Sequence, residues 1–188
     1  MSIEAQRYAE AISLRNGAPA LVRAIRLDDR ERLQTAFLGL DPESVYLRYF
    51  SYKHELSEAD LDRLCNPDFH ERVVLVATQP GSTEEIIIAS AGYVAHDGAD
   101  SVRAAEVAFA VAEDVQGQGL SSKLLAVLAE LARADGVQRF DAEVLSRNAA
   151  MLSVFEHSGL PMQVGAEQDG VISVSLSLAA PTAAGASR

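Results

Sequence analysis

The order of apolar and polar positions predicts strands and helices along most of the chain. Short apolar or alternating runs predict six strands, at residues 21–25, 72–77, 85–94, 103–111, 140–145 and 171–178. Apolar residues at helical spacing predict helices that start near Asp28 or Asp29, Asp41, Ser57, Leu120 or Ser121, and Asn148. The turn-forming residues 80–83 favour an antiparallel hairpin, whereas the long helix from Leu120 favours a parallel crossover. This alternation indicates an α/β (α+β) protein.

The length and the apolar content favour a single domain. The chain has 188 residues, and 48% of them are hydrophobic, which is enough for one sizeable core. We expect an N-terminal extension at residues 1–20, the folded domain at 21–178, and a flexible alanine-rich tail at 179–188.

Charge and cysteine content narrow the possible partners. The formal net charge of −11 disfavours nucleic acid and anionic membranes as partners, and it favours cationic amines such as lysine side chains. The lone Cys65 excludes an internal disulfide framework, and no residue spacing suggests a metal site. No apolar run resembles a signal peptide or could cross a bilayer. We therefore expect a cytoplasmic protein, either a monomer or a homodimer.

The most informative stretch joins the strand at 103–111 to the long helix, and it reads Glu113-Asp-Val-Gln-Gly-Gln-Gly-Leu-Ser-Ser-Lys123. Gly117 and Gly119 allow a sharp turn and a close approach of a ligand to the backbone. The unpaired N–H groups and the dipole at a helix start suit a phosphate or a diphosphate. A Walker loop fits poorly because Lys123 follows two serines. A dinucleotide-binding fold also fits poorly, because polar residues separate the strand from the glycines. The stretch predicts an anion site on the amides of residues 116–122.

Two motifs carry a resemblance to a known family. Gln116-x-x-Gly119-x-Ser121 resembles the Gln/Arg-x-x-Gly-x-Gly/Ala signature of the Gcn5-related N-acetyltransferases (GNAT), with serine as the small last residue. Residues 148–160 resemble the family's Asn-x-x-Ala-x-x-x-Tyr-x-x-x-Gly-Phe helix, with Phe155 in place of the tyrosine. The likeness covers roughly residues 21–178. It implies a GNAT fold, with a mixed, mostly antiparallel sheet of six to seven strands and helices on both faces.

The resemblance implies acetyl-CoA as the acyl donor and no metal. The backbone N–H of Val111, or of a neighbour, would polarise the thioester carbonyl if the strand bulges as it does in the family. Asn148 would contact the pantetheine arm or a bridging water, although asparagine at a helix start is equally suited to capping it. Phe155 has no hydroxyl that could reprotonate the CoA thiolate. The thiolate would therefore leave unassisted, or it would take a proton from solvent or Ser153. The resemblance assigns cofactor binding to Phe109, Val111, Gln116, Gly117, Gln118, Gly119, Leu120, Ser121, Ser122, Asn148 and Phe155.

Glu106 is the candidate catalytic residue. By strand alternation it shares a face with Ala108 and Ala110, whose small side chains leave space beside the carboxylate. A partly desolvated glutamate there would hold protons more tightly and could act as a base. The simpler alternative is a strand carboxylate that faces water or pairs with Arg103.

The stretch from Ala105 to Phe109 and several stretches in the front half resemble the bacterial Pat-like branch of the family, which acetylates protein lysines. That resemblance implies that Glu106 is the base. The expected function is transfer of an acetyl group from acetyl-CoA to an amine, in particular a protein lysine. The alternatives are a small-molecule amine acetyltransferase and a non-catalytic acyl-CoA sensor. The aromatic residues of the second helix are expected mainly to pack in the core, namely Tyr46, Tyr49, Phe50 and Tyr52.

Overall fold

The computed structural model describes residues 4–49, 53–98 and 102–179, without side-chain detail at 47–49. Phe50, Tyr52, the side chain of Tyr49 and the predicted tail beyond Ala179 lie outside the described residues.

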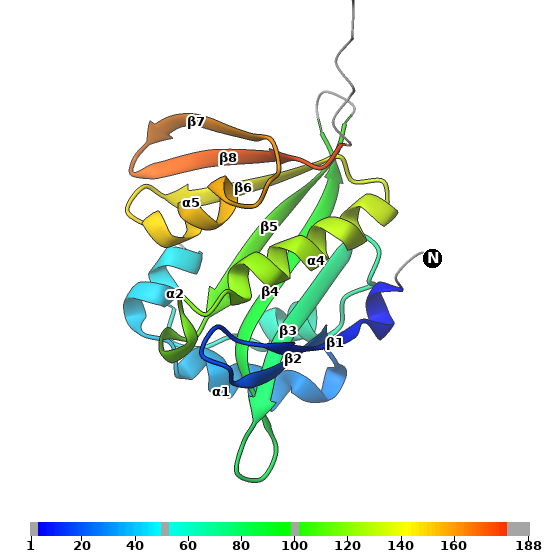
Figure 1. Ribbon diagram of the computed structural model, residues 1–188, viewed down its shortest axis with the longest axis vertical. Helices are drawn as coiled ribbons and strands as arrows, with labels where there is room; N and C mark the ends of the chain where they lie inside the picture. The colour runs from blue at the N-terminus through cyan, green and yellow to red at the C-terminus, as the bar shows by residue number, and fades with distance from the viewer. Residues whose placement is uncertain (1–3, 50–52, 99–101, 180–188) are drawn as a thin grey trace, which may run out of the picture.

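The strands form one mixed sheet in the order β1-β2-β3-β4-β5-β6-β8-β7 (Figure 1). Neighbouring strands are antiparallel except for β5 and β6, which are parallel. The mixed, mostly antiparallel sheet is therefore confirmed, and the described residues contribute eight strands to it where six to seven were expected. The strands are β1 (Ala9–Ser13), β2 (Pro19–Ala24), β3 (Arg72–Pro80), β4 (Glu85–Asp97), β5 (Arg103–Val111), β6 (Arg139–Leu145), β7 (Met162–Gln168) and β8 (Val171–Ser177).

The two strands that the apolar pattern does not predict are the edge strands β1 and β7. β1 lies within the segment expected to be an N-terminal extension, and it pairs with β2 from Ala9↔Arg23 to Ser13↔Pro19. β7 is exposed along nearly its whole length. Edge strands with few buried side chains leave little apolar periodicity in the sequence, because pairing with their neighbour holds them in place.

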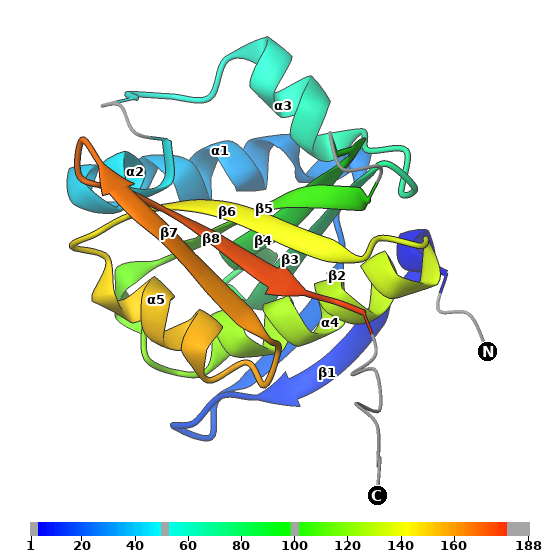
Figure 2. The ribbon, with the colours of Figure 1, turned by 90° about the horizontal axis from the view of Figure 1, so that it is seen from above.

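Helices cover both faces of the sheet, as expected (Figure 2). One face carries α1 (Arg30–Leu38), α2 (Pro42–Tyr49) and α3 (Glu58–Cys65). The other face carries α4 (Leu120–Ala134) and α5 (Ala149–Glu156). Short 3₁₀ turns at Ala5–Arg7, Leu27–Asp29 and Glu113–Val115 complete the described elements.

A separate apolar core lies on each face. The larger core packs α4 against the sheet through Leu124, Leu125, Leu128 and Leu131, each at most 1% exposed. The smaller core lies under α1 to α3 and is centred on Leu33, Phe37, Val45, Leu61, Val74 and Val76.

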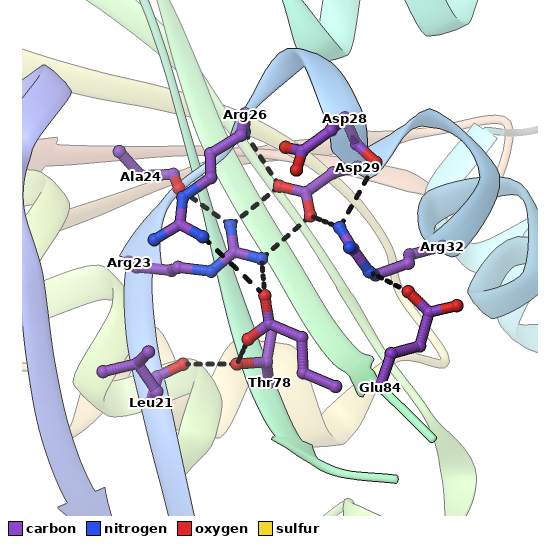
Figure 3. Close-up of polar contacts among 10 residues, drawn as sticks. Leu21, Arg23, Ala24, Arg26, Asp28, Asp29, Arg32, Thr78 and Glu84 are labelled. Atoms are coloured by element: carbon purple, nitrogen blue, oxygen red, sulfur yellow. Dashed lines mark hydrogen bonds and ion pairs between the residues drawn. The ribbon is translucent and has the colours of Figure 1, made fainter. Parts of the chain in front are cut away.

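A buried ion-pair network fastens the start of α1 to the sheet (Figure 3). The guanidinium of Arg23 on β2, only 1% exposed, donates two hydrogen bonds to the fully buried Asp29, from Nη1 to Oδ2 (2.7 Å) and from Nη2 to Oδ1 (2.8 Å). Arg23 Nη2 also donates to Glu85 on β4 (2.6 Å), and Arg32 Nη1 donates to Asp29 Oδ1 (2.8 Å). The Asp29 carboxylate therefore makes ion pairs, and it accepts the N–H of Arg26 instead of capping α1.

Candidate active site

The sheet opens between β5 and β6. Their parallel pairing consists of Ala104↔Arg139, Ala105↔Phe140 and Glu106↔Asp141. Beyond Glu106 the register between these two strands ends, and β6 continues only with β8 on its other side. The two strands diverge toward the end of the molecule that carries the loop before α4 (Figure 1). Residues 107–111 thus form one side of a wedge-shaped opening.

The register of β5 determines which backbone groups face this opening. The N–H of Ala112 donates to the carbonyl of Ile88 on the β4 side. Because hydrogen-bonding direction alternates along an antiparallel strand, the N–H groups of Phe109 and Val111 point to the β6 side, where the ladder has ended. The register with β4 runs from Arg103 to Val111 without a shift, so the bulge on which the expectation for Val111 depended is absent. The divergence of β6 exposes these amides instead.

The glycine loop presents a row of unbonded amides. Gly117 and Gly119 have φ values of 72° and 90°, in the left-handed region that glycine tolerates best. α4 begins at Leu120, as predicted, and Gly119 at its N-cap supplies no side-chain cap. Within the described chain, no backbone N–H from Gly117 to Ser122 donates a hydrogen bond. The N–H of Gln116, which was also expected in the anion site, instead donates to the carbonyl of Glu113 (3.2 Å) because it closes the 3₁₀ turn. The loop therefore has the geometry of an anion site at a helix N-terminus.

The turn between β1 and β2 packs on this loop. Arg15 Nη1 donates to the carbonyl of Gly117 (3.1 Å), and its backbone N–H donates to the carbonyl of Gln118 (3.3 Å). The N–H of Asn16 donates to Gln118 Oε1 (3.0 Å). These contacts bring the positive charge of Arg15 to the loop. Arg15 is not among the predicted site residues, because nothing local in residues 1–20 indicates that the turn reaches Gly117.

Helix α5 lines the opening from the side of β6. Phe155 is buried at 1% exposure, and its ring meets that of Phe109 edge-on, with 6.2 Å between centroids. These two assigned residues are therefore brought together. The Asn148 Oδ1 accepts the N–H of Met151 (3.1 Å), so the capping role considered for Asn148 is present. Gln116 Nε2 donates to the carbonyl of Val111 (3.3 Å), which links the loop to the end of β5.

A cavity of about 510 Å³ lies on the opposite face of β5, under α1 and α3. Its floor contains the small residues Ser90, Gly92, Ala108 and Ala110. A Cβ atom on Gly92 would come within 2.5 Å of the Val73 carbonyl oxygen, so this position of the floor requires glycine. The prediction that Glu106 shares its face with Ala108 and Ala110 is confirmed, because all three line the cavity.

Glu106 lies at the mouth of this cavity and is exposed, so the expected partial desolvation of its carboxylate is not observed. Among the described residues, none makes a hydrogen bond or an ion pair with its carboxylate, and Arg103 instead approaches Asp97 (4.0 Å). Glu106 is also the last residue of β5 that pairs with β6. Its backbone therefore marks the inner end of the opening, while its side chain points to the cavity.

The described part of the chain contains no helix long and apolar enough to span a membrane. The same residues contain no group of three or more His, Cys, Asp or Glu side chains arranged to hold a metal ion.

Comparisons with known proteins agree with this geometry. Residues 40–160 match a family model described as the acetyltransferase (GNAT) family. The chain is 32% identical over 148 residues to the acetyltransferase Pat of Mycolicibacterium smegmatis, covering 79% of this chain and 43% of that relative. It is 36% identical to the crystal structure of the GNAT domain of S. lividans PAT, with a TM-score of 0.80 and coverage of 90% and 96%. YncA of Salmonella typhimurium, solved with acetyl-CoA, shares the fold at 22% identity, with a TM-score of 0.63 and coverage of 87% and 98%.

Proposed function

The chain belongs to the acetyltransferase (GNAT) family, and from that premise we propose that it transfers an acetyl group from acetyl-CoA to a protein lysine. Acetyl-CoA is supported by its presence in the YncA structure, which shares the fold. Lysine is supported by the likeness to Pat and by the net charge of −11, which attracts cationic acceptors. The chain spans less than half of the Pat relative, so the proposal concerns the catalytic domain alone.

The cofactor would occupy the opening between β5 and β6. Its diphosphate would accept hydrogen bonds from the free N–H groups at 117–122, at the positive end of the α4 dipole. The pantetheine arm would extend along β5, where the N–H groups of Phe109 and Val111 face the opening. Phe155 would support the arm through its contact with the Phe109 ring.

The transfer then needs one proton acceptor and one oxyanion donor. Glu106 would take the proton from the lysine ammonium, directly or through one water, which frees the nitrogen lone pair. The amine would attack the thioester carbon, and the N–H of Val111 would stabilise the oxyanion that forms. The C–N bond forms as the C–S bond breaks, CoA leaves as a thiolate, and the nitrogen loses its second proton to solvent to give the neutral amide. Thiols are much stronger acids than the N–H groups of amines, so a thiolate is a tolerable leaving group that solvent can protonate, and Phe155 need not supply a proton.

One observation carries the proposal. Within the described residues, strand β5 exposes unpaired backbone N–H groups to the opening and a carboxylate without a partner to the cavity, and both features meet at Glu106. An acyl donor in the opening and an amine in the cavity would therefore meet across a single strand.

Replacing Glu106 tests the role of the base. Glu106→Gln should lower kcat by roughly a hundredfold or more, because an amide cannot accept the proton, while the Kd for acetyl-CoA stays nearly unchanged. Thiol release with a lysine-bearing protein measures the rate, and calorimetry measures cofactor binding. Glu143→Gln is the matched control, since Glu143 is an exposed glutamate on the neighbouring strand β6 and does not line the cavity.

The outcomes separate three cases. Equal rates for wild type and Glu106→Gln would remove Glu106 from its role as base. Absence of acetyl-CoA binding would overturn the proposed function. Tight binding of acetyl-CoA without turnover on any amine would identify an acyl-CoA sensor. This alternative is specific because Phe155 has no hydroxyl.

A further inference from the structure

Three side chains form a row across the sheet at the mouth of the cavity. Arg72 on β3 is the register partner of Val94 on β4, and Val94 is the register partner of Glu106 on β5. Directly opposed residues share a face of the sheet, so all three side chains lie on the cavity side, and all three line the cavity. Strand spacing of about 4.8 Å places the Arg72 and Glu106 backbones roughly 10 Å apart.

The Arg72 guanidinium is short of partners. Its Nε is buried, and it makes no hydrogen bond within the described chain. No described carboxylate forms an ion pair with Arg72, and the nearby Asp68 uses its Oδ1 to accept the N–H groups of His70, Glu71 and Arg72. The Nε atoms of Arg23 and Arg103 are likewise buried without a partner, but both of these guanidiniums form an ion pair with a carboxylate, whereas among the described residues that of Arg72 does not. A buried donor without a partner is destabilising, so a ligand that accepts from it would be stabilised there.

The other charged groups at this cavity are arranged differently. Lys53 forms an ion pair with Asp60 (2.5 Å), so a carboxylate already neutralises its ammonium. Arg63 also lines the cavity, but it is exposed on α3, where solvent can reach its guanidinium. Arg72 is therefore the half-buried cation that an anionic ligand in the cavity would best satisfy.

Val94 separates the two charges and is 43% exposed. An exposed apolar side chain between a carboxylate and a guanidinium offers contact for a short aliphatic chain. A ligand with an ammonium group at one end, a few methylenes, and a carboxylate at the other end matches the order Glu106, Val94, Arg72.

From this row we propose that the amine acceptor carries a carboxylate in the same molecule, and that Arg72 binds this carboxylate while Glu106 faces the amine. The proposal rests on the proposed function and names the acceptor class within it. Two sources present this chemistry: a lysine with an acidic residue beside it in a protein, and a free amino acid.

The test compares acceptors that differ only in this charge. Acetyl transfer is measured with a lysine peptide that has a neighbouring Asp or Glu and with its Asn or Gln counterpart, and likewise with free lysine and lysine amide. For wild type, we expect the acidic member of the better pair to have a KM about tenfold lower or more, because ion pairing acts on acceptor binding. The pair with the higher kcat/KM identifies the source.

Substitutions at Arg72 then test whether its guanidinium causes the preference for the acidic acceptor. Arg72→Gln should raise the KM for the acidic acceptor to the level of its neutral counterpart, with kcat and the Kd for acetyl-CoA nearly unchanged. Arg72→Lys should restore part of the preference, since it keeps the charge but loses the forked geometry. Arg26→Gln is the control, because it removes an exposed arginine that does not line the cavity.

A ratio of acidic to neutral KM that is the same in wild type and Arg72→Gln would overturn the inference. So would a wild-type enzyme with no preference for the acidic acceptor, an outcome that does not require any variant to fold. Lack of transfer to every amine would instead overturn the proposed function, so the two failures are distinguishable. Acetyl-CoA binding and thermal unfolding of each variant show whether a lost preference reflects damage to the fold.

Discussion

Both faces of the sheet carry an apolar core, but the α1 face has the smaller core and adds a buried ion-pair network to it. On the α4 face, four leucines at most 1% exposed fill the space between helix and strands. On the α1 face, the helix start is attached by the Arg23–Asp29–Glu85 network, and a cavity of about 510 Å³ remains beside it. One face is closed by apolar packing, and the other is anchored at a buried point and stays partly open.

This difference indicates how a fold keeps an open cleft without losing its helices. Apolar packing gains free energy by removing contact with water, so it closes space. A paired buried charge instead fixes a helix at one place, and breaking the pair is costly. Here the anchor at Asp29 leaves Ser90, Gly92, Ala108 and Ala110 uncovered as the floor of the cavity.

The largest expected effect comes from breaking the anchor. Asp29→Asn should destabilise the fold by about 3–5 kcal/mol, because it leaves Arg23 charged and buried without its main partner. Urea unfolding at pH 7 measures the loss. Asp28→Asn, one residue earlier and exposed, is the matched control and should change stability by less than about 0.5 kcal/mol. A similar loss in both variants would show that the network is not the anchor.

The same anchor predicts a pH dependence. Burial alone would raise the pKa of Asp29, but hydrogen bonds from Arg23 and the Arg26 N–H hold it below its usual value. A carboxyl group with a lowered pKa stabilises the fold above its unfolded pKa of about 3.9, and this contribution disappears as pH falls through the folded pKa. The stability difference between wild type and Asp29→Asn should therefore be full near neutral pH and should shrink below about pH 4. A difference that stays constant in acid would contradict this.

Filling the cavity should weaken binding of the amine acceptor but not binding of acetyl-CoA. Ala108→Leu places an isobutyl group on the cavity floor, and we expect the KM of the amine acceptor to rise about tenfold or more because the space is lost. The Kd for acetyl-CoA should stay within about twofold, since the Ala108 side chain points into the cavity and not toward the opening at the edge of β5. Steady-state kinetics and calorimetry separate the two. Ala126→Leu, on the exposed side of α4, is the control.

The smallest expected effect concerns the glycine loop. Arg15→Gln removes the hydrogen bond to Gly117, and one such bond contributes about 0.5–1.5 kcal/mol. The Kd for CoA should therefore rise by about two- to tenfold, which calorimetry can resolve. Arg7→Gln, another exposed arginine of the N-terminal segment, should leave the Kd unchanged. An unchanged Kd in Arg15→Gln would mean that the loop keeps its shape without the turn.

Sequence alone predicted the parts of the molecule that have a strong local pattern. The start of α4 at Leu120 follows from the glycines and the leucine spacing, and the shared face of Glu106, Ala108 and Ala110 follows from strand alternation. These predictions concern residues close together in the chain. Their geometry is determined by local rules of helices and strands.

The rest depends on contacts between distant residues. The edge strands β1 and β7 are held by pairing and leave little apolar pattern. Arg15 reaches a loop more than a hundred residues away, and Arg72 joins the row of Glu106 only through the register of two strand pairs. The exposure of Glu106 likewise depends on where α1 and α3 leave the sheet uncovered.

The short ladder between β5 and β6 has one more consequence. A molecule seated beside Phe109 and Val111 would stand in for the stretch of neighbouring strand that these residues lack. Bound acetyl-CoA would then connect the sections of the sheet on either side of the opening. Its binding should slow hydrogen–deuterium exchange at the amides of Phe109 and Val111 more than anywhere else on β5.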